Sequence, residues 1–232
     1  MSSQLKLDWC SFKAAEFACK NWHYSKCVPA GKIVKIGVWE NEKFIGCVLF
    51  SRGANNHIGG PYGLDQTEVC ELTRVALTAH ETPVTRIVSI AIRMLRAYCP
   101  GMKAIISYAD EDEGHAGGIY KAGNWIYEGL KNAGPGGATV IHGKKVHNKT
   151  LHSKYGHNSI VWLREHVDPE AVLWVNKGKH KFVMPLDKTL RERLEFKQKA
   201  IMRRRGSSDP VEFHSTEDGV IPISAHHEAA NA

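Results

Sequence analysis

The stretch that decides the fold reads Ile105-Ile106-Ser107-Tyr108-Ala109-Asp110, followed after a polar loop by Gly117-Gly118-Ile119-Tyr120-Lys121-Ala122-Gly123-Asn124-Trp125-Ile126-Tyr127. The apolar run predicts a strand that ends on a carboxylate, and the glycine pair predicts the start of a short helix. A strand end that faces a helix N-terminus can hold an anionic or acyl ligand. We therefore expect either a ligand site, with Tyr120 placed to donate a proton, or a plain strand-loop-helix connection.

Apolar periodicity predicts further elements on both sides of this stretch. Helices are predicted at 11–22, 82–98, 118–125 and 190–205, with Ser11 and Thr82 as N-caps and Pro83 in a first turn. Strands are predicted at 33–39, 44–51, 70–77, 104–108, 159–164 and 181–184. Glycines predict a long loop at 53–64 and a break at 134–137, and residues 139–158 resist assignment. This order predicts a single mixed α/β (α+β) domain with a central, mostly antiparallel sheet flanked by helices.

The charge of the chain is unevenly distributed. The net charge is +7, residues 177–205 hold eleven Lys and Arg against three Asp and Glu, and residues 206–232 hold five acids and no base. We expect a domain at 1–205 that ends in a basic helix, followed by an acidic flexible tail at 206–232. The basic segment can attract a phosphate backbone; a solvated helix face is the simpler reading of a charge run alone.

Several classes of protein are disfavoured by composition. No window approaches 18 apolar residues without charge, so no membrane span is expected. The first residues lack the apolar stretch of a secretory signal. The six cysteines show no CxxC spacing, which favours reduced thiols in a cytoplasmic protein over disulfides.

The order of elements resembles that of the GNAT acyltransferase superfamily. Arg86-Ile87-Val88-Ser89-Ile90-Ala91 is similar to the pyrophosphate loop of that superfamily, Q/R-x-x-G-x-G/A, with Ser89 at the first glycine. Tyr120 to Trp125 resembles its Y-x-x-x-G-F element, with Asn124 in place of the glycine and Trp125 in place of Phe. The resemblance implies that Tyr120 protonates a departing thiolate. It also implies an acetyl-CoA site formed by Val75, Leu77, Arg86, Ile87, Val88 and Ser89.

Longer strings resemble the Mom family, DNA-modification proteins of Mu-like bacteriophages. The resemblance covers roughly residues 5 to 160 and includes Asn21-Trp22-His23-Tyr24-Ser25-Lys26, Leu49-Phe50-Ser51-Arg52-Gly53, Glu71-Leu72-Thr73-Arg74-Val75-Ala76-Leu77 and Gly118 to Tyr127. It implies conversion of adenine in double-stranded DNA to an N6-modified form, described as methylcarbamoyladenine, which protects phage DNA from restriction in the host cytoplasm. It further implies acetyl-CoA and iron as cofactors.

Each candidate residue has a plainer alternative. Asp110, Tyr120, Ser51 and Arg74 are the catalytic candidates. Asp110 can instead cap the following loop, Tyr120 can simply pack in the core, and Arg74 can form an ordinary ion pair with Glu71. Iron with open positions favours His and carboxylate ligands. The predicted metal ligands are therefore His23, Asp110 and Tyr120, with His115 as a further candidate.

A second set of residues is predicted to contact DNA. Phosphate contact and base stacking suit basic and aromatic side chains, and the candidates are Arg52, Lys144, Lys145, Lys154 and Tyr155. The alternative is a set of solvated loops.

Three functions follow from these observations. The first is a DNA-modifying transferase; the second is an ordinary GNAT N-acetyltransferase acting on an amine or protein; the third is a non-catalytic DNA-binding anti-restriction protein. Attack of adenine N6 on acetyl-CoA would leave an acetyl group on N6, whereas the product implied by the resemblance carries a methylene and a terminal amide. The first function therefore needs a redox metal or another donor.

Overall fold

The computed structural model describes residues 4–53, 55–206, 215–216 and 219–220 of the chain. It divides into two compact units, Met1–Arg191 and Glu192–Ala232. The second unit contains most of helix α6 (Lys188–Gly206) and the short strands β11 (Ser215–Thr216) and β12 (Gly219–Val220). The predicted acidic tail at 206–232 lies for the most part outside the described residues.

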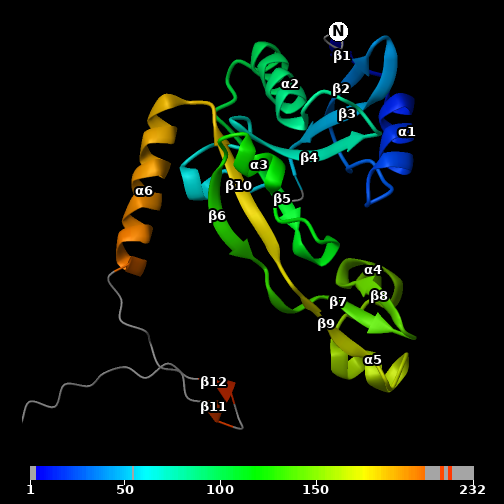
Figure 1. Cartoon of the computed structure of the whole chain (residues 1–232). Helices are drawn as coiled ribbons and strands as arrows, with labels where there is room; N and C mark the ends of the chain where they lie inside the picture. Colours follow the sequence, from blue (N-terminus) through cyan, green and yellow to red (C-terminus); the bar gives the residue numbers. More distant parts are fainter. Residues whose placement is uncertain (1–3, 54, 207–214, 217–218, 221–232) are drawn as a thin grey trace, which may run out of the picture. The chain divides into compact units, whose positions relative to one another are not determined.

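The first unit is built on a seven-stranded sheet with the strand order β1-β2-β3-β4-β5-β10-β6 (Figure 1). Its strands are Leu5–Trp9 (β1), Ile33–Glu40 (β2), Lys43–Ser51 (β3), Val69–Leu77 (β4), Ala104–Asp110 (β5), Ile126–Lys131 (β6) and Lys179–Pro185 (β10). All neighbouring pairs are antiparallel except β4 and β5. The predicted mixed, mostly antiparallel sheet is thus confirmed, although the sequence pattern missed β1 and β6.

Two helices cover opposite faces of this sheet. Helix α1 (Phe12–Trp22) packs Ala15, Ala18 and Cys19 against Leu49, whereas α2 (Val84–Tyr98) belongs to the core cluster that contains Phe50. Successive residues of a strand point to opposite faces, so Leu49 and Phe50 place the two helices on the two sides. Both helices have the positions that apolar periodicity predicted.

A smaller three-stranded sheet lies between β6 and β10 in the sequence. It has the order β8-β7-β9, from Gly134–Ile141 (β7), Lys144–His147 (β8) and Val172–Asn176 (β9). Helices α4 (Asn148–Tyr155) and α5 (Ile160–His166) accompany it, and Figure 1 shows this group beyond the ends of β6 and β10. We call residues 132–178 the small module. Its own core contains Ile141, Leu151, Leu163 and Ala171.

Two local predictions in this region were wrong. Residues 159–164 form helix α5 and not a strand, because Ile160, Leu163 and Val167 pack into the module core at helical spacing. The glycines at 134–137 begin strand β7 and do not break the chain. The sequence pattern also missed strand β9.

The short helix of the deciding stretch is also shorter than predicted. Helix α3 (Gly118–Ala122) ends at Gly123, and Asn124 adopts a left-handed φ of 59° that stops the helix. Trp125 therefore leads directly into β6.

The helix cap predicted at Thr82 is replaced by a different contact. The N-cap of α2 is Pro83, which makes no side-chain cap bond. The Thr82 hydroxyl instead donates to the Glu40 carboxylate at 2.5 Å, and the same carboxylate accepts the backbone N–H groups of Glu81 and Thr82. A carboxylate from β2 thus fixes the loop that precedes α2.

The parallel strands β4 and β5 separate along their length. They pair only at Val69–Ala104, Cys70–Ile105 and Glu71–Ile106, although β4 continues to Leu77 and β5 to Asp110. Beyond Glu71 the facing edges of both strands have no strand partner.

Among the described residues no helix has the length and apolar character that a membrane crossing requires.

Candidate functional site

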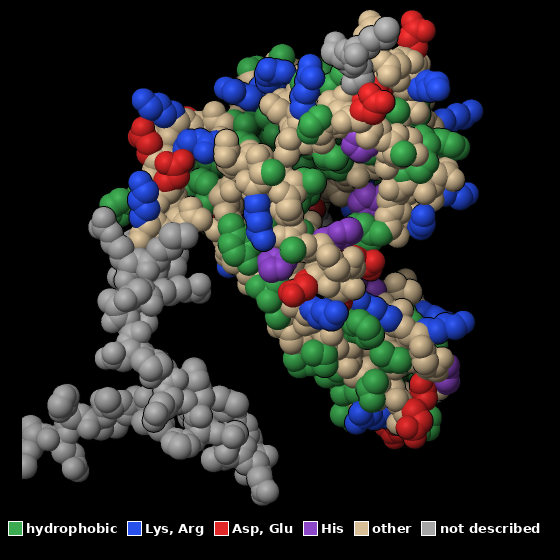
Figure 2. Space-filling view, in the orientation of Figure 1, with side chains coloured by type: hydrophobic (Ala, Val, Ile, Leu, Met, Phe, Trp, Pro, Cys, Tyr) green, Lys and Arg blue, Asp and Glu red, His purple; other side chains and the backbone are tan. Residues whose placement is uncertain are grey.

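A cleft of about 470 Å³ opens where β4 and β5 separate. It is lined by the ends of both strands, by the segment after α1 and by the loop before α3, and histidine side chains gather around a hollow in this surface (Figure 2). The structure brings together here the following predicted residues: His23, Arg74, Val75, Leu77, Asp110, His115 and Tyr120. The cleft is the candidate active site.

Tyr120 forms the inner wall of the cleft. Its ring packs against Trp125 and Phe182, and its hydroxyl lies 2.7 Å from the Ser107 hydroxyl, which is also 2.8 Å from the Leu72 carbonyl oxygen. Burial raises the pKa of Tyr120 to about 12, so the phenol keeps its proton at neutral pH. The packing alternative is therefore confirmed, whereas proton donation by Tyr120, whose side chain also lines the cleft, stays a prediction.

The turn into α3 requires glycine at one position. Gly117 has a left-handed φ of 74°, and a Cβ atom there would lie 2.2 Å from the Phe182 ring. No L-residue with a side chain fits without moving this ring. The first glycine of the pair noted in the sequence thus sets how closely α3, with Tyr120, approaches β10.

Asp110 acts as a cap and as an ion-pair partner. Its carboxylate accepts the backbone N–H of Asp112 at the start of the short helix η2 (Glu111–Glu113) and lies 2.9 Å from the Lys179 ammonium group. The capping alternative is therefore confirmed, while a catalytic role of Asp110 stays a prediction.

Three aromatic rings lie against one another in tilted arrangements at the mouth of the cleft. The Tyr24 ring lies 4.3 Å from that of His23 and 5.1 Å from that of His115. His23 Nδ1 accepts the backbone N–H of Ser25 at 3.1 Å. Burial, together with the charge of Arg74, lowers the pKa of His23 to about 4, so its imidazole is neutral at physiological pH.

Arg74 is held by backbone oxygen atoms and not by an acid. Its guanidinium donates to the carbonyl groups of Thr73 and Cys27, which ties β4 to the segment after α1. No ion pair with Glu71 forms among the described residues. Arg74 therefore supports the wall of the cleft that carries His23 and Tyr24.

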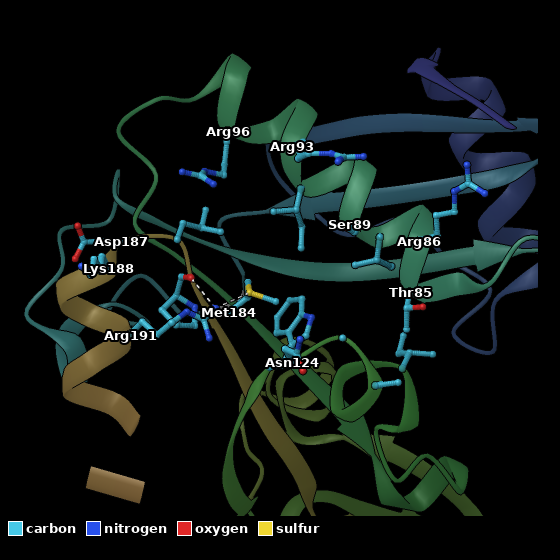
Figure 3. A pocket seen from close by; sticks show the side chains of 18 residues that line it. Thr85, Arg86, Ser89, Arg93, Arg96, Asn124, Met184, Asp187, Lys188 and Arg191 are labelled. Atoms are coloured by element: carbon cyan, nitrogen blue, oxygen red, sulfur yellow. Dashed lines mark hydrogen bonds between the residues drawn. The ribbon is translucent and has the colours of Figure 1, made fainter. Parts of the chain in front are cut away.

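A second pocket of about 690 Å³ lies between α2, α3 and the start of α6. Figure 3 shows arginines of α2 along one side and Lys188 and Arg191 on the other. Arg86, Ser89, Arg93 and Arg96 line it from the same face of α2, and Val88 contributes a partly apolar wall. The predicted cofactor residues of α2 therefore line this pocket, with the exception of Ile87, which is fully buried in the core.

The backbone of Arg86 to Ala91 does not form a phosphate loop. These residues lie inside α2, where amides beyond the first turn bond to carbonyl groups four residues earlier. The Arg86 and Ile87 amides already bond to the Pro83 carbonyl. The amides left for an anion at this helix N-terminus are those of Val84 and Thr85.

Two predicted residues near β3 lie away from the cleft. Ser51 is buried and accepts the backbone N–H of Gly53, and Arg52 donates to Gln66 at 3.4 Å. Both line a separate pocket of about 530 Å³ that Phe50 and Leu95 also border. The structure thus does not place Ser51 beside the other catalytic candidates.

The remaining DNA-binding candidates all lie on the small module. Lys144 and Lys145 are in β8, and Lys154 and Tyr155 end α4. Lys145 lies 3.0 Å from the Asp112 carboxylate and 4.2 Å over the Trp174 ring, so it has a structural role. Lys144 and Lys154 are exposed and remain suitable for phosphate contact.

The described residues do not fit an iron ion. Among them, no three His, Cys, Asp or Glu side chains gather as a metal site. Of the predicted ligands, Asp110 is engaged by Lys179 and the Tyr120 hydroxyl by Ser107. The predicted ligand set therefore lines one cleft without forming a coordination sphere.

Several residues at these pockets are not among those predicted from the sequence. Arg93 and Arg96 follow Arg86 at intervals of seven and ten, which places all three on one helix face, so this signal was present in the sequence. His80 lines the cleft and Lys179 pairs with Asp110, which also lines it; both come from distant segments, and no local pattern indicates them.

The fold and cleft define a mixed α/β domain with a candidate ligand site at the separation of its parallel strands. Comparison with known proteins shows to which family the chain belongs. The Mom protein family matches residues 4–201, and the chain belongs to this family.

The chain is also similar to individual known proteins. It is 25% identical over 201 residues to "Methylcarbamoylase mom" of Escherichia phage Mu, covering 84% of this chain and 81% of the relative. A Bacillus subtilis acetyltransferase solved in complex with CoA has a TM-score of 0.46 at 9% identity, covering 80% and 100% of the two chains. A probable GNAT-family acetyltransferase of Chromobacterium violaceum has a TM-score of 0.42 at 10% identity, covering 80% and 84%.

Proposed function

We propose that this protein is a phage DNA-modification enzyme that converts adenine in DNA to N6-(methylcarbamoyl)adenine and so protects phage DNA from restriction in the host cytoplasm. Membership of the Mom family and the name of the phage Mu relative support the reaction class. The observation that carries the proposal is the cleft between β4 and β5, which combines an open strand edge, a buried phenol and an aromatic mouth.

The open edge of β4 suits an extended ligand that contains amides. Beyond Glu71 the edge of β4 that faces β5 has no strand partner, and such an edge can pair with an added extended chain. The N-terminus of α2 supplies the Val84 and Thr85 amides for phosphate, and Arg86 lines the adjoining pocket. These groups fit acetyl-CoA, which would supply an activated acyl group.

Tyr120 then acts as the proton donor. Ser107 fixes its hydroxyl at the point where the strands separate, and its pKa of about 12 keeps the phenol protonated at neutral pH, so that its O–H can donate to a departing group. The departing thiolate would be that group, and a phenolate left on Tyr120 would regain its proton from water.

The aromatic rings at the mouth suit an extruded base. Adenine N6 in a duplex is reached by flipping the nucleotide, at a cost of about a few kcal/mol. The exposed Tyr24 ring, in contact with His23 and His115, offers a stacking surface. Exposed Lys144 and Lys154 of the small module would contact phosphates.

The methylcarbamoyl group requires a nitrogen source beyond the coenzyme, because acyl transfer alone leaves an acetyl group on N6. Mass spectrometry of nucleosides from cells that express the chain therefore tests the proposal. We expect a methylcarbamoyl adduct of deoxyadenosine, which Tyr120→Phe reduces strongly and Lys13→Ala, an exposed change on α1, leaves intact. An acetyl adduct on a protein or small amine would favour an ordinary N-acetyltransferase. Unmodified deoxyadenosine beside folded protein would refute the proposal.

A further inference from the structure

Asp112 of η2 joins the small module to the segment that borders the cleft. Its carboxylate accepts hydrogen bonds from the Lys145 ammonium group of β8, from the Trp174 indole N–H of β9 and from the backbone N–H of Lys177, each at 3.0 Å. All three donors belong to the small module. Among the described residues, every side-chain hydrogen bond or ion pair between the small module and the rest of the chain ends on Asp112.

This carboxylate is largely enclosed and stays ionised. Its side chain is 10% exposed, and the hydrogen bonds from Lys177, Trp174 and Lys145 lower the pKa of Asp112 to about 2. Hydrogen bonds to a charged acceptor are stronger than those between neutral groups. The Lys145 ammonium group also lies 4.2 Å over the Trp174 ring, so the donors from β8 and β9 are held to each other as well. One charged side chain thus fixes two strands of the module to the segment that follows β5.

The segment that Asp112 anchors forms one border of the candidate active site. We call residues 110–118 the cleft segment; both of its ends line the cleft, as do the residues that follow η2. Its backbone is bonded internally, because the Gly114 and His115 amides donate to the carbonyl groups of Glu111 and Asp110. A shift of η2 would therefore move the residues at the mouth of the cleft.

The module carries a proposed phosphate contact directly beside this connection. Lys144 and Lys145 are consecutive residues of β8, so their side chains point to opposite faces of the strand. Lys145 binds Asp112, whereas Lys144 is exposed. Residues 129–164 contain no Asp or Glu, so no acid of this stretch opposes the approach of a phosphate. The anchor and the phosphate contact thus share one short strand.

We propose that Asp112 is a positioning residue, which links DNA phosphates bound on the small module to the cleft segment and so sets where the base meets the mouth of the cleft. This inference rests on the proposed function, in which the module contacts phosphates and the flipped adenine stacks on Tyr24 beside His115. A flipped base stays bonded to the backbone of its own strand, so a productive complex needs the phosphate contacts and the base site in one fixed geometry. Asp112 maintains that geometry, because the side-chain bonds between module and cleft segment meet on it.

The first measurement needs neither DNA nor activity. Hydrogen exchange followed by NMR gives the protection of the Gly114 and His115 amides in the wild type, in Asp112→Ala and in Glu113→Ala. The last is the matched control, because it removes an exposed carboxylate from the same short helix. Asp112→Ala should lower the protection of both amides by about 10-fold or more, because opening of the segment no longer breaks bonds to the module. Unchanged protection would overturn the inference, whatever the protein does to DNA.

Two milder variants keep this test decisive if Asp112→Ala does not fold. Asp112→Asn retains an oxygen that accepts hydrogen bonds, and Trp174→Phe removes only the indole donor. Each should lower the protection of the same amides by a smaller factor than Asp112→Ala. If neither variant differs from Glu113→Ala, the inference is wrong.

The second measurement separates positioning from binding. A duplex that carries an unpaired 2-aminopurine reports, through its fluorescence, both the affinity for DNA and the surroundings of the base at saturation. Asp112→Ala should lose most of the fluorescence change at saturation and keep most of the affinity, and Asp112→Asn should recover part of the change. Lys144→Ala should do the opposite, weakening the binding and keeping the change, since it removes only a phosphate contact.

The outcomes of this experiment distinguish the two proposals. A full fluorescence change in saturated Asp112→Ala would refute the positioning role of Asp112. Wild-type protein that neither binds DNA nor modifies adenine would refute the proposed function, and amide protection alone then decides whether Asp112 holds the cleft segment.

Discussion

Removal of the Tyr120 hydroxyl should separate its role in the fold from its role in the cleft. Tyr120→Phe keeps the ring between Trp125 and Phe182 and deletes one hydrogen bond to Ser107. Ser107 can still donate to the Leu72 carbonyl, so no buried group is left without a partner. The expected loss of stability is therefore about 1 kcal/mol, the net value of one hydrogen bond.

Ser107→Ala should cost more, although it removes the smaller side chain. It leaves both the Leu72 carbonyl and the Tyr120 hydroxyl without Ser107, and an orphaned buried group costs about 1–3 kcal/mol. Tyr120→Ala removes the ring as well and should cost about 3–5 kcal/mol. The expected order of destabilisation is thus Tyr120→Phe, then Ser107→Ala, then Tyr120→Ala.

Urea unfolding monitored by circular dichroism measures these differences, and the double variant Ser107→Ala/Tyr120→Phe completes a thermodynamic cycle. A loss of activity of about 10²-fold or more in Tyr120→Phe, beside its small loss of stability, assigns the hydroxyl to proton transfer. The reasoning fails if Tyr120→Phe destabilises more than Ser107→Ala, or if the two changes are strictly additive.

Three further predictions concern the turn into α3, the loop before α2 and the mouth of the cleft. Gly117→Ala should destabilise the protein by about 2 kcal/mol or more, because the new methyl group meets the Phe182 ring and φ is positive. Gly118→Ala should be tolerated, and urea unfolding compares the two variants. Hydrogen bonds from the Thr82 hydroxyl and the Glu81 amide lower the pKa of Glu40 to about 2 in the folded state. The stability that Glu40 contributes should be complete above its ordinary pKa of 4.5 and should disappear as the pH falls toward 2. The free energy of unfolding of Glu40→Gln should therefore fall less than that of the wild type as the pH is lowered from 4.5 toward 2, which acid titration can measure. Tyr24→Ala should weaken the binding of DNA that contains an unpaired adenine, whereas Tyr24→Phe should retain it. Fluorescence anisotropy measures both affinities, and equal affinities of the two variants would exclude a stacking role.

The sequence predicted those elements whose apolar pattern has one clear period. Helix α2 is an example, because its stripe from Ile87 to Leu95 faces the sheet and needs no distant information. Helix α5 is the opposite case. Its apolar residues serve the separate core of the small module, and nothing in the short run from Ile160 to Val167 shows that such a core exists. Short apolar runs do not distinguish a helix turn from a strand.

The candidate site was predictable where one short segment carries it. Tyr120 and Asp110 were identified because strand, loop and helix follow one another in the chain. The isolated position of Ser51 and the brace that Glu40 forms at the loop before α2 were not, since both depend on strand pairing and on contacts between distant segments. The Arg86 motif correctly indicated residues that line a pocket, but its backbone does not form a phosphate loop, because these residues continue a helix that begins at Val84.

The small module is inserted between two paired strands of the main sheet. Lys131 at the end of β6 and Lys179 at the start of β10 are paired neighbours on adjacent antiparallel strands, and such strands lie about 4.8 Å apart. A short hairpin turn can therefore bridge the two residues in place of everything between them. The module is then an insertion in a β-hairpin, and the exposed lysines that we assign to phosphate contact belong to the insertion. The strands that frame the cleft belong to the host sheet. The inserted module, with its proposed phosphate contacts, can therefore change without altering the residues that line the cleft.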